Sequence, residues 1–333
     1  MIVLDADVLG RRRTGDETYV TNLLRELPAA APELRFVAVT RHPELVPDGV
    51  EAVELPAGSQ ELRMAWSLPR LLRRLGPELA HFQHALPLGF RGRTVVTLHD
   101  LSFERRPELM GRLDRLTFKT VVPRAARRAD HVLVVSERTK RDVVELYGVA
   151  PAKVTVTPNG VDPAFTPGGT DGGYLLFVGG IQARKDPLAA LEAAAAVGLP
   201  LVVAGPEKDP ELARALRAGG ADLRGYVTKD GLAELYRGAS ALLMPSRFEG
   251  FGLPVIEAMA CGTPVVIAGD DAMREVAGDA AVYADDGDFT AAARRALADR
   301  ARLAAAGIER AALFSWAETA RKTVAVYRSV LAA

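Results

Sequence analysis

Short hydrophobic runs alternate along the chain with longer segments in which hydrophobic residues recur every three or four positions. The short runs are rich in β-branched residues and lack polar interruptions, which is typical of parallel strands covered on both faces. They occupy residues 2–4, 36–39, 94–98, 132–135, 174–178, 201–204, 241–244 and 264–268. Helical spacing is clear at residues 19–27 and 188–195. This alternation predicts α/β architecture with doubly wound parallel sheets.

A turn-rich stretch divides the chain near its middle. Proline, glycine, asparagine and aspartate are concentrated at residues 157–173, and a strand-like run restarts at Tyr174. The chain has 333 residues, enough for about two domains. We therefore expect two Rossmann-like domains, residues 1–166 and 167–314, with a C-terminal helix over 315–333 packing back on the first. Such sheets bind ligands at the carboxyl ends of their strands, so two domains facing one another would enclose a cleft.

Composition narrows the classes of partner. Lys plus Arg number 42 and Asp plus Glu number 42, which removes the simplest electrostatic case for nucleic acid or an anionic membrane as the main partner. The longest stretch without charged residues, 193–206, is too short to cross a bilayer. The first residues do not resemble a signal peptide, and Cys261 is the single cysteine, which excludes an intrachain disulfide. These features favour a soluble, cytoplasmic protein.

The segment 245–264 carries the strongest chemical signal. It leads from a predicted strand through a loop containing Gly250 and Gly252 into a short helix. Backbone amides at the start of a helix attract anions. Glu249 and Glu257 flank this site, and a carboxylate there would face hydroxyl groups, since it repels a phosphate but accepts two hydrogen bonds from a diol. The alternative is that both glutamates are solvated surface residues.

Two other sets of polar residues follow predicted strands. Arg184 and Lys185 come shortly after the run 174–178, and their charges suit a diphosphate. His99 ends the run 94–98, where α/β sheets place functional groups, and Asp100 would orient a neighbour or cap the next segment. A solvated pair and a buried structural histidine are the respective alternatives.

Glu249 and Glu257 have the Glu-x7-Glu spacing of the retaining GT-B glycosyltransferases of family 4, and the chain resembles this family over nearly its whole length. The most specific likeness is the Glu-x7-Glu segment itself. The other matching segments are the phosphate-binding stretch at 177–186, the interdomain linker at 156–162, the strand-end histidine at 97–101 and the acceptor loop at 14–19.

This resemblance implies retaining, metal-independent transfer of a hexose from a nucleotide-diphosphate sugar to a hydroxyl acceptor, without a cofactor. The residues that it implies for catalysis are His99, Glu249, Arg184 and Lys185. Those implied for donor binding are Glu257, Gly179, Gly180, Gly250, Phe251, Gly252, Leu253, Tyr226 and Val227. Those implied for acceptor binding are Gly15, Asp16 and Asp100. The His-Asp-Leu sequence favours GDP-mannose over UDP-sugars as the donor.

Some features leave alternatives open. The sequence Gly15-Asp16-Glu17 lacks the family's second glycine, which favours the rival hypothesis of a non-catalytic sugar-nucleotide-binding protein. A GT-B-fold sugar-nucleotide epimerase is the other rival hypothesis. Asp5 and Asp7 form a DxD, the metal–diphosphate motif of a different glycosyltransferase fold, but here they end the first strand and we predict no metal. Basic residues in 70–74 and 112–128 are interpreted as solvated helix faces rather than a membrane-docking surface. The acceptor would be a sugar, glycan or lipid-linked molecule.

Overall fold

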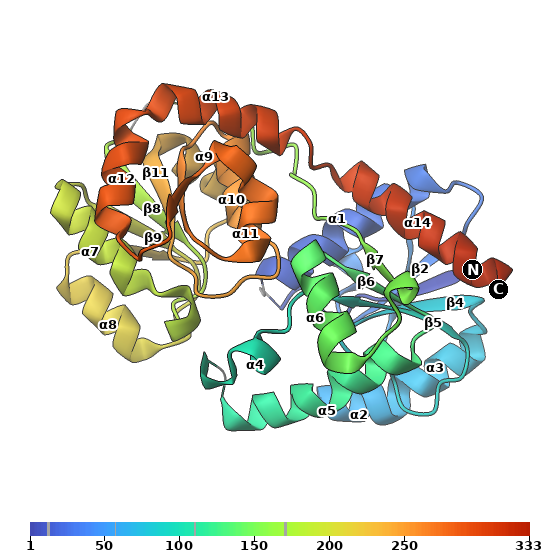
Figure 1. Ribbon diagram of the computed structural model, residues 1–333. Helices are drawn as coiled ribbons and strands as arrows, with labels where there is room; N and C mark the ends of the chain where they lie inside the picture. Colours follow the sequence, from blue (N-terminus) through green and yellow to red (C-terminus); the bar gives the residue numbers. More distant parts are fainter. Residues whose placement is uncertain (12–13, 57, 110, 170–171) are drawn as a thin grey trace. The chain divides into compact units, whose positions relative to one another are not determined.

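The computed structural model describes residues 1–11, 14–56, 58–109, 111–169 and 172–333, and the chain divides into two compact units (Figure 1). Unit 1 comprises Met1–Gly160 together with Trp316–Ala333, and unit 2 comprises Val161–Ser315. The boundary predicted after residue 166 therefore falls after Gly160. The reason is local pairing: the amide of Val161 donates to the carbonyl of Phe314 at 3.2 Å, within unit 2.

Unit 1 is built on a sheet of seven parallel strands. The strands are β1 (Ile2–Asp5), β2 (Phe36–Thr40), β3 (Glu51–Glu54), β4 (Leu79–Gln83), β5 (Arg93–Leu98), β6 (His131–Val134) and β7 (Val154–Val156). Their order is β3-β2-β1-β4-β5-β6-β7. The chain moves outward in one direction from β1 and in the other from β4, so the topology switches between these two strands. Open α/β sheets bind ligands at such a switch, beyond the carboxyl ends of the strands.

Helices cover both faces of this sheet. They are α1 (Thr14–Ala30), α2 (Gln60–Leu62), α3 (Leu68–Leu75), α4 (Ser102–Arg105), α5 (Arg112–Arg128), α6 (Glu137–Tyr147) and α14 (Trp316–Ala332). A π-helical turn, Arg63–Ser67, joins α2 to α3. The C-terminal helix α14 packs against α1, as Figure 1 shows, and the ring of Trp316 lies 6.1 Å from that of Tyr19.

Local sequence signals set the ends of α6. Ser136 accepts a hydrogen bond from the amide of Thr139 at 3.1 Å, which satisfies one of the orphan amides of the first turn. Gly148 ends the helix with φ +64°, a left-handed conformation that glycine adopts without strain. The residues at its two ends therefore determine where α6 begins and ends.

Unit 2 contains a sheet of six parallel strands. They are β8 (Tyr174–Val178), β9 (Leu201–Ala204), β10 (Asp222–Gly225), β11 (Ala239–Met244), β12 (Val265–Ala268) and β13 (Val282–Ala284). Their order is β10-β9-β8-β11-β12-β13, so the switch lies between β8 and β11. The covering helices are α7 (Pro187–Val197), α8 (Pro210–Ala218), α9 (Lys229–Gly238), α10 (Leu253–Ala260), α11 (Asp271–Ala277), α12 (Phe289–Ala298) and α13 (Arg300–Ala311). The prediction of two doubly wound α/β domains is confirmed.

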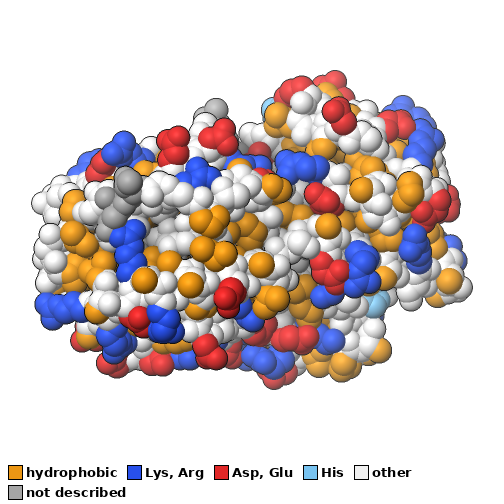
Figure 2. Space-filling model, turned by 90° about the horizontal axis from the view of Figure 1, so that it is seen from above, with side chains coloured by type: hydrophobic (Ala, Val, Ile, Leu, Met, Phe, Trp, Pro, Cys, Tyr) orange, Lys and Arg blue, Asp and Glu red, His pale blue; other side chains and the backbone are white. Residues whose placement is uncertain are grey.

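Charge is mixed rather than segregated on one face of the molecule. On the face shown in Figure 2, lysine and arginine side chains are interspersed with aspartate and glutamate. This distribution agrees with the equal totals of basic and acidic residues. Within the part of the chain that the structure describes, no helix has both the length and the hydrophobicity that a membrane crossing requires.

Candidate functional site

Two loops meet at the switch point of the unit 2 sheet. One follows β8 and contains Gly179 and Gly180 before a 3-10 turn, Ala183–Lys185; the other follows β11 and leads into α10. Because β8 and β11 are neighbouring parallel strands, both loops leave the same edge of the sheet. The amide of Arg247 donates to the carbonyl of Arg184 at 3.0 Å, which ties the loops together.

Three predicted catalytic side chains form one cluster across these loops. The ammonium group of Lys185 donates to Oε1 of Glu249, and Nη1 of Arg184 lies 3.5 Å from Oε2 of the same carboxylate. Arg184 also donates to the carbonyl of Phe248. Glu249 is only 7% exposed, so the interpretation as a solvated loop residue is wrong. Burial acts to raise the pKa of Glu249, but the charges of Lys185 and Arg184 outweigh it and hold that pKa below its usual range.

Glycine is needed at three positions beside this cluster, either because two backbones lie very close together or because the backbone turns with a positive φ. Gly179 has φ +150°, and Gly205 at the end of β9 has φ +149°. A Cβ on Gly205 would lie 2.1 Å from the carbonyl oxygen of Gly179, so the backbones of the two strand ends can approach only with glycine there. Gly252 has φ +98° at the N-cap of α10, which turns the loop into the helix. The loop conformation therefore depends on glycine at these positions.

Glu257 lies within α10 and is also buried. The hydroxyl group of Tyr236, from α9, donates to Oε2 of Glu257 at 2.9 Å. Burial raises the pKa of Glu257 to about 7, the charge of Asp162 adds to that rise, and the hydrogen bond from Tyr236 opposes it. Its interpretation as an exposed helix residue is therefore wrong, and its carboxyl group titrates near neutral pH.

The other residues that were predicted to bind the donor sugar nucleotide differ in how deeply they are buried. Phe251 is 4% exposed and its ring packs against Phe314, with 5.8 Å between ring centroids, so its side chain belongs to the core. Leu253 begins α10, next to the buried Gly250 loop. Tyr226 follows β10 and is 55% exposed. Since β9 separates β10 from β8, Tyr226 lies at a strand end two strands from β8. The roles of these residues stay predictions.

His99, which was predicted to be catalytic, directly follows β5, at the edge of the unit 1 sheet that the carboxyl ends of the strands form. Its Nε2 is 3.0 Å from Oε1 of Gln83, which accepts a hydrogen bond, and 3.9 Å from Oδ1 of Asp16 in the first turn of α1. The ring of Tyr19 packs edge-on against His99, at 4.8 Å. Burial lowers the pKa of His99 to about 4, so this imidazole is neutral at pH 7.

A residue that was not predicted, His84, completes this group. It follows β4, and its Nε2 lies 3.6 Å from Oδ2 of Asp16, while its ring centroid is 5.2 Å from that of His99. Burial acts to lower the pKa of His84, but the hydrogen bond and the charge of Asp16 outweigh it and raise that pKa. His81 and His84 are close in sequence, but the neighbouring sequence supplies no further metal ligands, so the sequence alone does not indicate a site at His84. The preceding run Leu79–Gln83 contains polar residues and was not assigned as a strand.

The other predicted acceptor residues have local roles. Oδ1 of Asp100 accepts hydrogen bonds from the amide of Ser102 at 2.9 Å and from its hydroxyl group at 2.8 Å, so Asp100 holds the first residue of α4 in place. Gly15 is exposed in the first turn of α1. Glu17 accepts a hydrogen bond from the amide of Gly10 at 2.8 Å and thereby folds the preceding loop onto the helix. Of the acidic pair that follows Gly15, only Asp16 faces the histidines.

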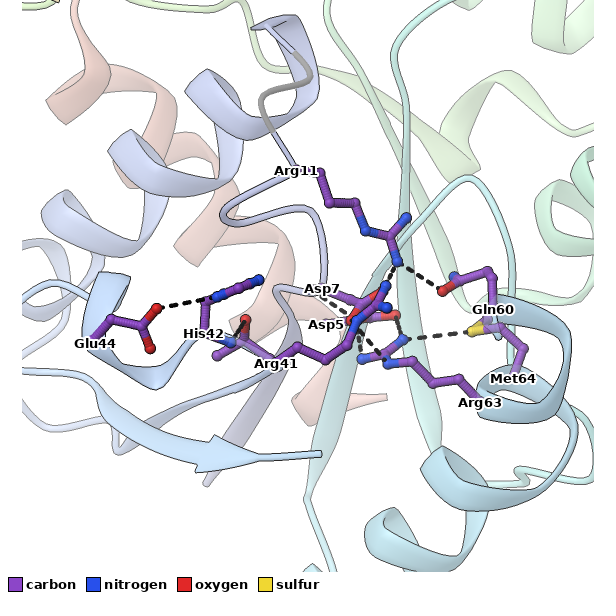
Figure 3. Close-up of polar contacts among 10 residues, drawn as sticks. Asp5, Asp7, Arg11, Arg41, His42, Glu44, Gln60, Arg63 and Met64 are labelled. Atoms are coloured by element: carbon purple, nitrogen blue, oxygen red, sulfur yellow. Dashed lines mark hydrogen bonds and ion pairs between the residues drawn. The ribbon is translucent and has the colours of Figure 1, made fainter. Parts of the chain in front are cut away.

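Asp5 and Asp7, at the end of β1, are held by arginines (Figure 3). Arg63 is fully buried and donates to both oxygens of Asp5, at 3.0 and 2.6 Å. Arg41 donates to both oxygens of Asp7, at 2.8 and 2.9 Å, and Arg11 donates to Asp7 as well. A metal ion on this pair would have to displace guanidinium groups that already neutralise the carboxylates. The DxD is therefore a structural ion-pair network that anchors the π-helical turn to the sheet.

Comparison with protein families assigns both halves of the chain. A family model described as Glycosyltransferase Family 4 matches residues 13–165, and one described as Glycosyl transferases group 1 matches residues 172–299. Together these matches cover most of both units.

Several named proteins are similar in sequence. A D-inositol 3-phosphate glycosyltransferase of Frankia alni is 34% identical over 305 residues, covering 78% of this chain and 70% of that protein. One of the same name from Geodermatophilus obscurus is 36% identical over 237 residues, 60% of this chain. This match spans only about half, 52%, of the Geodermatophilus protein. O-antigen chain mannosyltransferase B of Escherichia coli is 28% identical, covering 71% of this chain and 70% of that protein.

Solved structures extend the likeness to nearly the whole chain. A sucrose-phosphate synthase of Thermosynechococcus elongatus superimposes with a TM-score of 0.80 at 22% identity, covering 99% of both chains. Anabaena HepE, in complex with UDP-glucose, superimposes with a TM-score of 0.74 at 14% identity, covering 98% of this chain and 99% of that chain. At these identities the likeness concerns the fold, and it confirms the predicted GT-B fold.

Proposed function

The chain belongs to glycosyltransferase family 4, and we propose that it transfers a hexosyl group, with retention of configuration, from a nucleoside-diphosphate sugar to a hydroxyl group of an acceptor. The observation that carries this proposal is the cluster of Lys185, Arg184 and Glu249 at the switch point of the unit 2 sheet. Two cations share one carboxylate there, so the three side chains together carry a net positive charge where α/β sheets bind ligands.

The chemistry of glycosyl transfer requires such a positive charge. When the bond between the sugar and the diphosphate breaks, negative charge grows on the departing phosphate oxygens. A guanidinium and an ammonium group fixed at a partly buried site stabilise that charge, because solvent screening is weak there. We propose that Arg184 and Lys185 hold the diphosphate and that the reaction needs neither a metal ion nor a cofactor.

The two buried glutamates then face the uncharged parts of the donor. We propose that Glu257, on the helix that follows the loop, binds the ribose hydroxyls, and that Glu249 binds hydroxyls of the donor sugar together with the amides of Phe251 and Gly252. A carboxylate only accepts hydrogen bonds and a diol donates two, so the groups are complementary. The base would be recognised by the backbone near Tyr226 and Val227.

Unit 1 would bind the acceptor. Asp16 and His99 lie together at the edge of its sheet that the carboxyl ends of the strands form. A neutral imidazole and a carboxylate are both able to bind a hydroxyl group. Relatives named for inositol 3-phosphate and for the O-antigen chain suggest a polyol or a saccharide as acceptor. The E. coli mannosyltransferase supports the preference for GDP-mannose, with UDP-sugars as the alternative donors.

A thermal-shift panel of UDP, GDP, ADP and their sugars tests the donor site directly. A ligand at 100 times its Kd should add about 2.7 kcal/mol to the stability of the native state. Lys185→Ala and Arg184→Ala should abolish most of that gain. Arg214→Ala is the matched control, because Arg214 lies in unit 2 with a side chain that is 74% exposed. If no nucleotide stabilises the wild-type protein, the donor site has been assigned wrongly.

Turnover assays separate transfer from the rival activities. Release of nucleoside diphosphate from the correct donor should require a hydroxyl acceptor, should survive EDTA and should fall strongly in Lys185→Ala. Isomerisation of a sugar nucleotide without acceptor, with the nucleotide still attached, would instead identify an epimerase. Binding of donor without turnover over a panel of polyols and glycans would identify a binding protein.

A further inference from the structure

Three potential metal ligands from separate elements meet at the edge of the unit 1 sheet. Asp16 lies in the first turn of α1, His84 follows β4 and His99 follows β5. β4 and β5 are paired in parallel register, and the amide of His84 donates to the carbonyl of Thr97 at 3.0 Å. This pairing brings the two histidines to the same strand edge, and α1 brings Asp16 there from β1.

The donor atoms converge closely enough to share an ion. Oδ2 of Asp16 lies 3.6 Å from Nε2 of His84, and Oδ1 lies 3.9 Å from Nε2 of His99. One donor atom from each of the three residues lies within 4.8 Å of the other two. Nitrogen and oxygen ligands at ordinary zinc distances are about 3.3–3.6 Å apart in a tetrahedron. Small side-chain movements would therefore close the site around an ion.

We propose that Asp16, His84 and His99 form a binding site for a divalent transition-metal ion such as Zn²⁺. Two imidazoles and one carboxylate are the donor set that zinc, cobalt and related ions prefer, whereas Mg²⁺ prefers oxygen ligands and retains its water. Three protein ligands leave the fourth position of a tetrahedral ion to a water molecule.

The geometry at His84 is imposed by the fold rather than by its local sequence. His84 has φ +60°, a left-handed conformation that is strained for a residue other than glycine. Its Nδ1 is buried and has no hydrogen-bond partner among the residues that the structure describes. His99 would exchange its hydrogen bond to Gln83 for the ion. The tertiary structure therefore holds His84 against Asp16 despite strain and an unsatisfied nitrogen.

A neighbouring histidine shows that proximity alone does not make a ligand. His81, on β4, is fully buried; its Nδ1 is 2.6 Å from the hydroxyl group of Tyr327 and its Nε2 is 2.7 Å from that of Thr97. Both nitrogens are occupied by these core contacts, so His81 has no donor atom to offer. The site is restricted to the three residues whose donor atoms face one another.

An ion at this site would compete with the acceptor. This competition rests on the proposed function, but the binding of the ion does not depend on it. Under that function Asp16 and His99 bind an acceptor hydroxyl. Zn²⁺ should therefore inhibit transfer at concentrations that fill the site, and excess acceptor should relieve the inhibition.

Calorimetric titration of the full-length, chelator-treated protein tests the site. ZnCl₂ should bind with one equivalent per chain, while MgCl₂ should give no binding heat. His84→Ala and Asp16→Asn should each weaken Zn²⁺ binding at least tenfold, because each removes one of three ligands. His42→Ala is the control: His42 is an exposed unit 1 histidine paired with Glu44, and its loss should leave the high-affinity equivalent unchanged.

Two measurements distinguish the loss of a metal site from misfolding of a variant and from failure of the proposed function. Circular dichroism of the variants must match that of the wild type, and Asp16→Asn preserves the shape of the side chain where His84→Ala does not. Absence of stoichiometric Zn²⁺ binding by the wild type, or equal affinity in the folded Asp16→Asn protein, would overturn the metal site. Nucleotide-induced thermal stabilisation is read separately at unit 2, so its loss would refute the proposed function and leave the metal site standing.

Discussion

Replacing Glu249 by glutamine should destabilise the ligand-free protein and increase the stabilisation that a nucleoside diphosphate provides. In the ligand-free protein, Glu249 is the shared counter-ion of Lys185 and Arg184. Its removal leaves two cations close together in a site where all three side chains are at least four-fifths buried. A bound diphosphate would supply the missing negative charge, so the penalty should appear only without ligand.

The magnitude follows from the geometry. At 3.5 Å and an effective dielectric constant of 20, the attraction between Arg184 and Glu249 is about 5 kcal/mol before desolvation is subtracted. Breaking a buried ion pair by removing one partner typically costs about 3–5 kcal/mol. We expect about 3 kcal/mol here, because the glutamine amide still accepts a hydrogen bond from Lys185. For a unit of this size, that loss corresponds to a fall in Tm of about 6–12 °C.

Calorimetric melting of both proteins, with and without saturating UDP or GDP, measures this effect. Glu211→Gln is the matched control, because Glu211 lies in the same unit with a side chain that is 88% exposed, and it should change stability by less than about 0.5 kcal/mol. The reasoning is refuted if Glu249→Gln melts like the wild type without ligand. It is also refuted if the nucleotide stabilises the variant less than it stabilises the wild type.

Three further substitutions test other parts of the structure. The pKa of Glu257 rises from 4.5 to about 7 on folding, so the free energy of unfolding of the wild type should fall by about 3 kcal/mol between those pH values. In urea titrations at several pH values, Glu257→Gln should not show this decline, and above pH 7 its stability relative to the wild type should be higher than at pH 4.5. Arg63→Met should cost about 3–5 kcal/mol in urea-induced unfolding, because Asp5 is left buried without its bidentate partner. Gly205→Ala should lower Tm and weaken nucleotide binding, since its Cβ would collide with the carbonyl of Gly179; an unchanged melting curve would contradict that contact.

The interior strands of both sheets were predictable except for β4, and the edge strands β3, β7, β10 and β13 were not. β1, β5, β8 and β11 are mainly hydrophobic and almost entirely buried because helices cover both of their faces. The edge strand β3 (Glu51–Glu54) is mostly exposed, and β10 (Asp222–Gly225) alternates between exposed and partly buried residues. Such short, polar strands are defined by pairing with a neighbour rather than by their own sequence, so hydrophobic runs do not reveal them.

The unit 2 site was more readable than the unit 1 site for a related reason. Glu249 and Glu257 lie in one continuous loop and helix, and the neighbouring Arg184 and Lys185 come from one short turn. The group around His84 instead combines single residues from three elements, separated by long stretches of chain. Its assembly depends on β4, a strand whose polar residues concealed it, so the sequence showed His99 and Asp16 separately and not as neighbours.

Arginine is paired with a carboxylate in both units, but the pairing holds the fold together in unit 1 and, under the proposed function, binds the diphosphate in unit 2. In unit 1, Arg63 is fully buried and matched bidentately with Asp5, so a ligand would have to separate a buried ion pair to reach either group. In unit 2, the side chains of Arg184 and Lys185 are 17% and 12% exposed, and they share a single carboxylate. An incoming diphosphate can approach these cations from solvent and share them with Glu249, because two cations face one carboxylate. Compared with the buried, bidentate pairing of Arg63 with Asp5, the second cation and the partial exposure of the unit 2 cluster therefore leave positive charge available to a ligand.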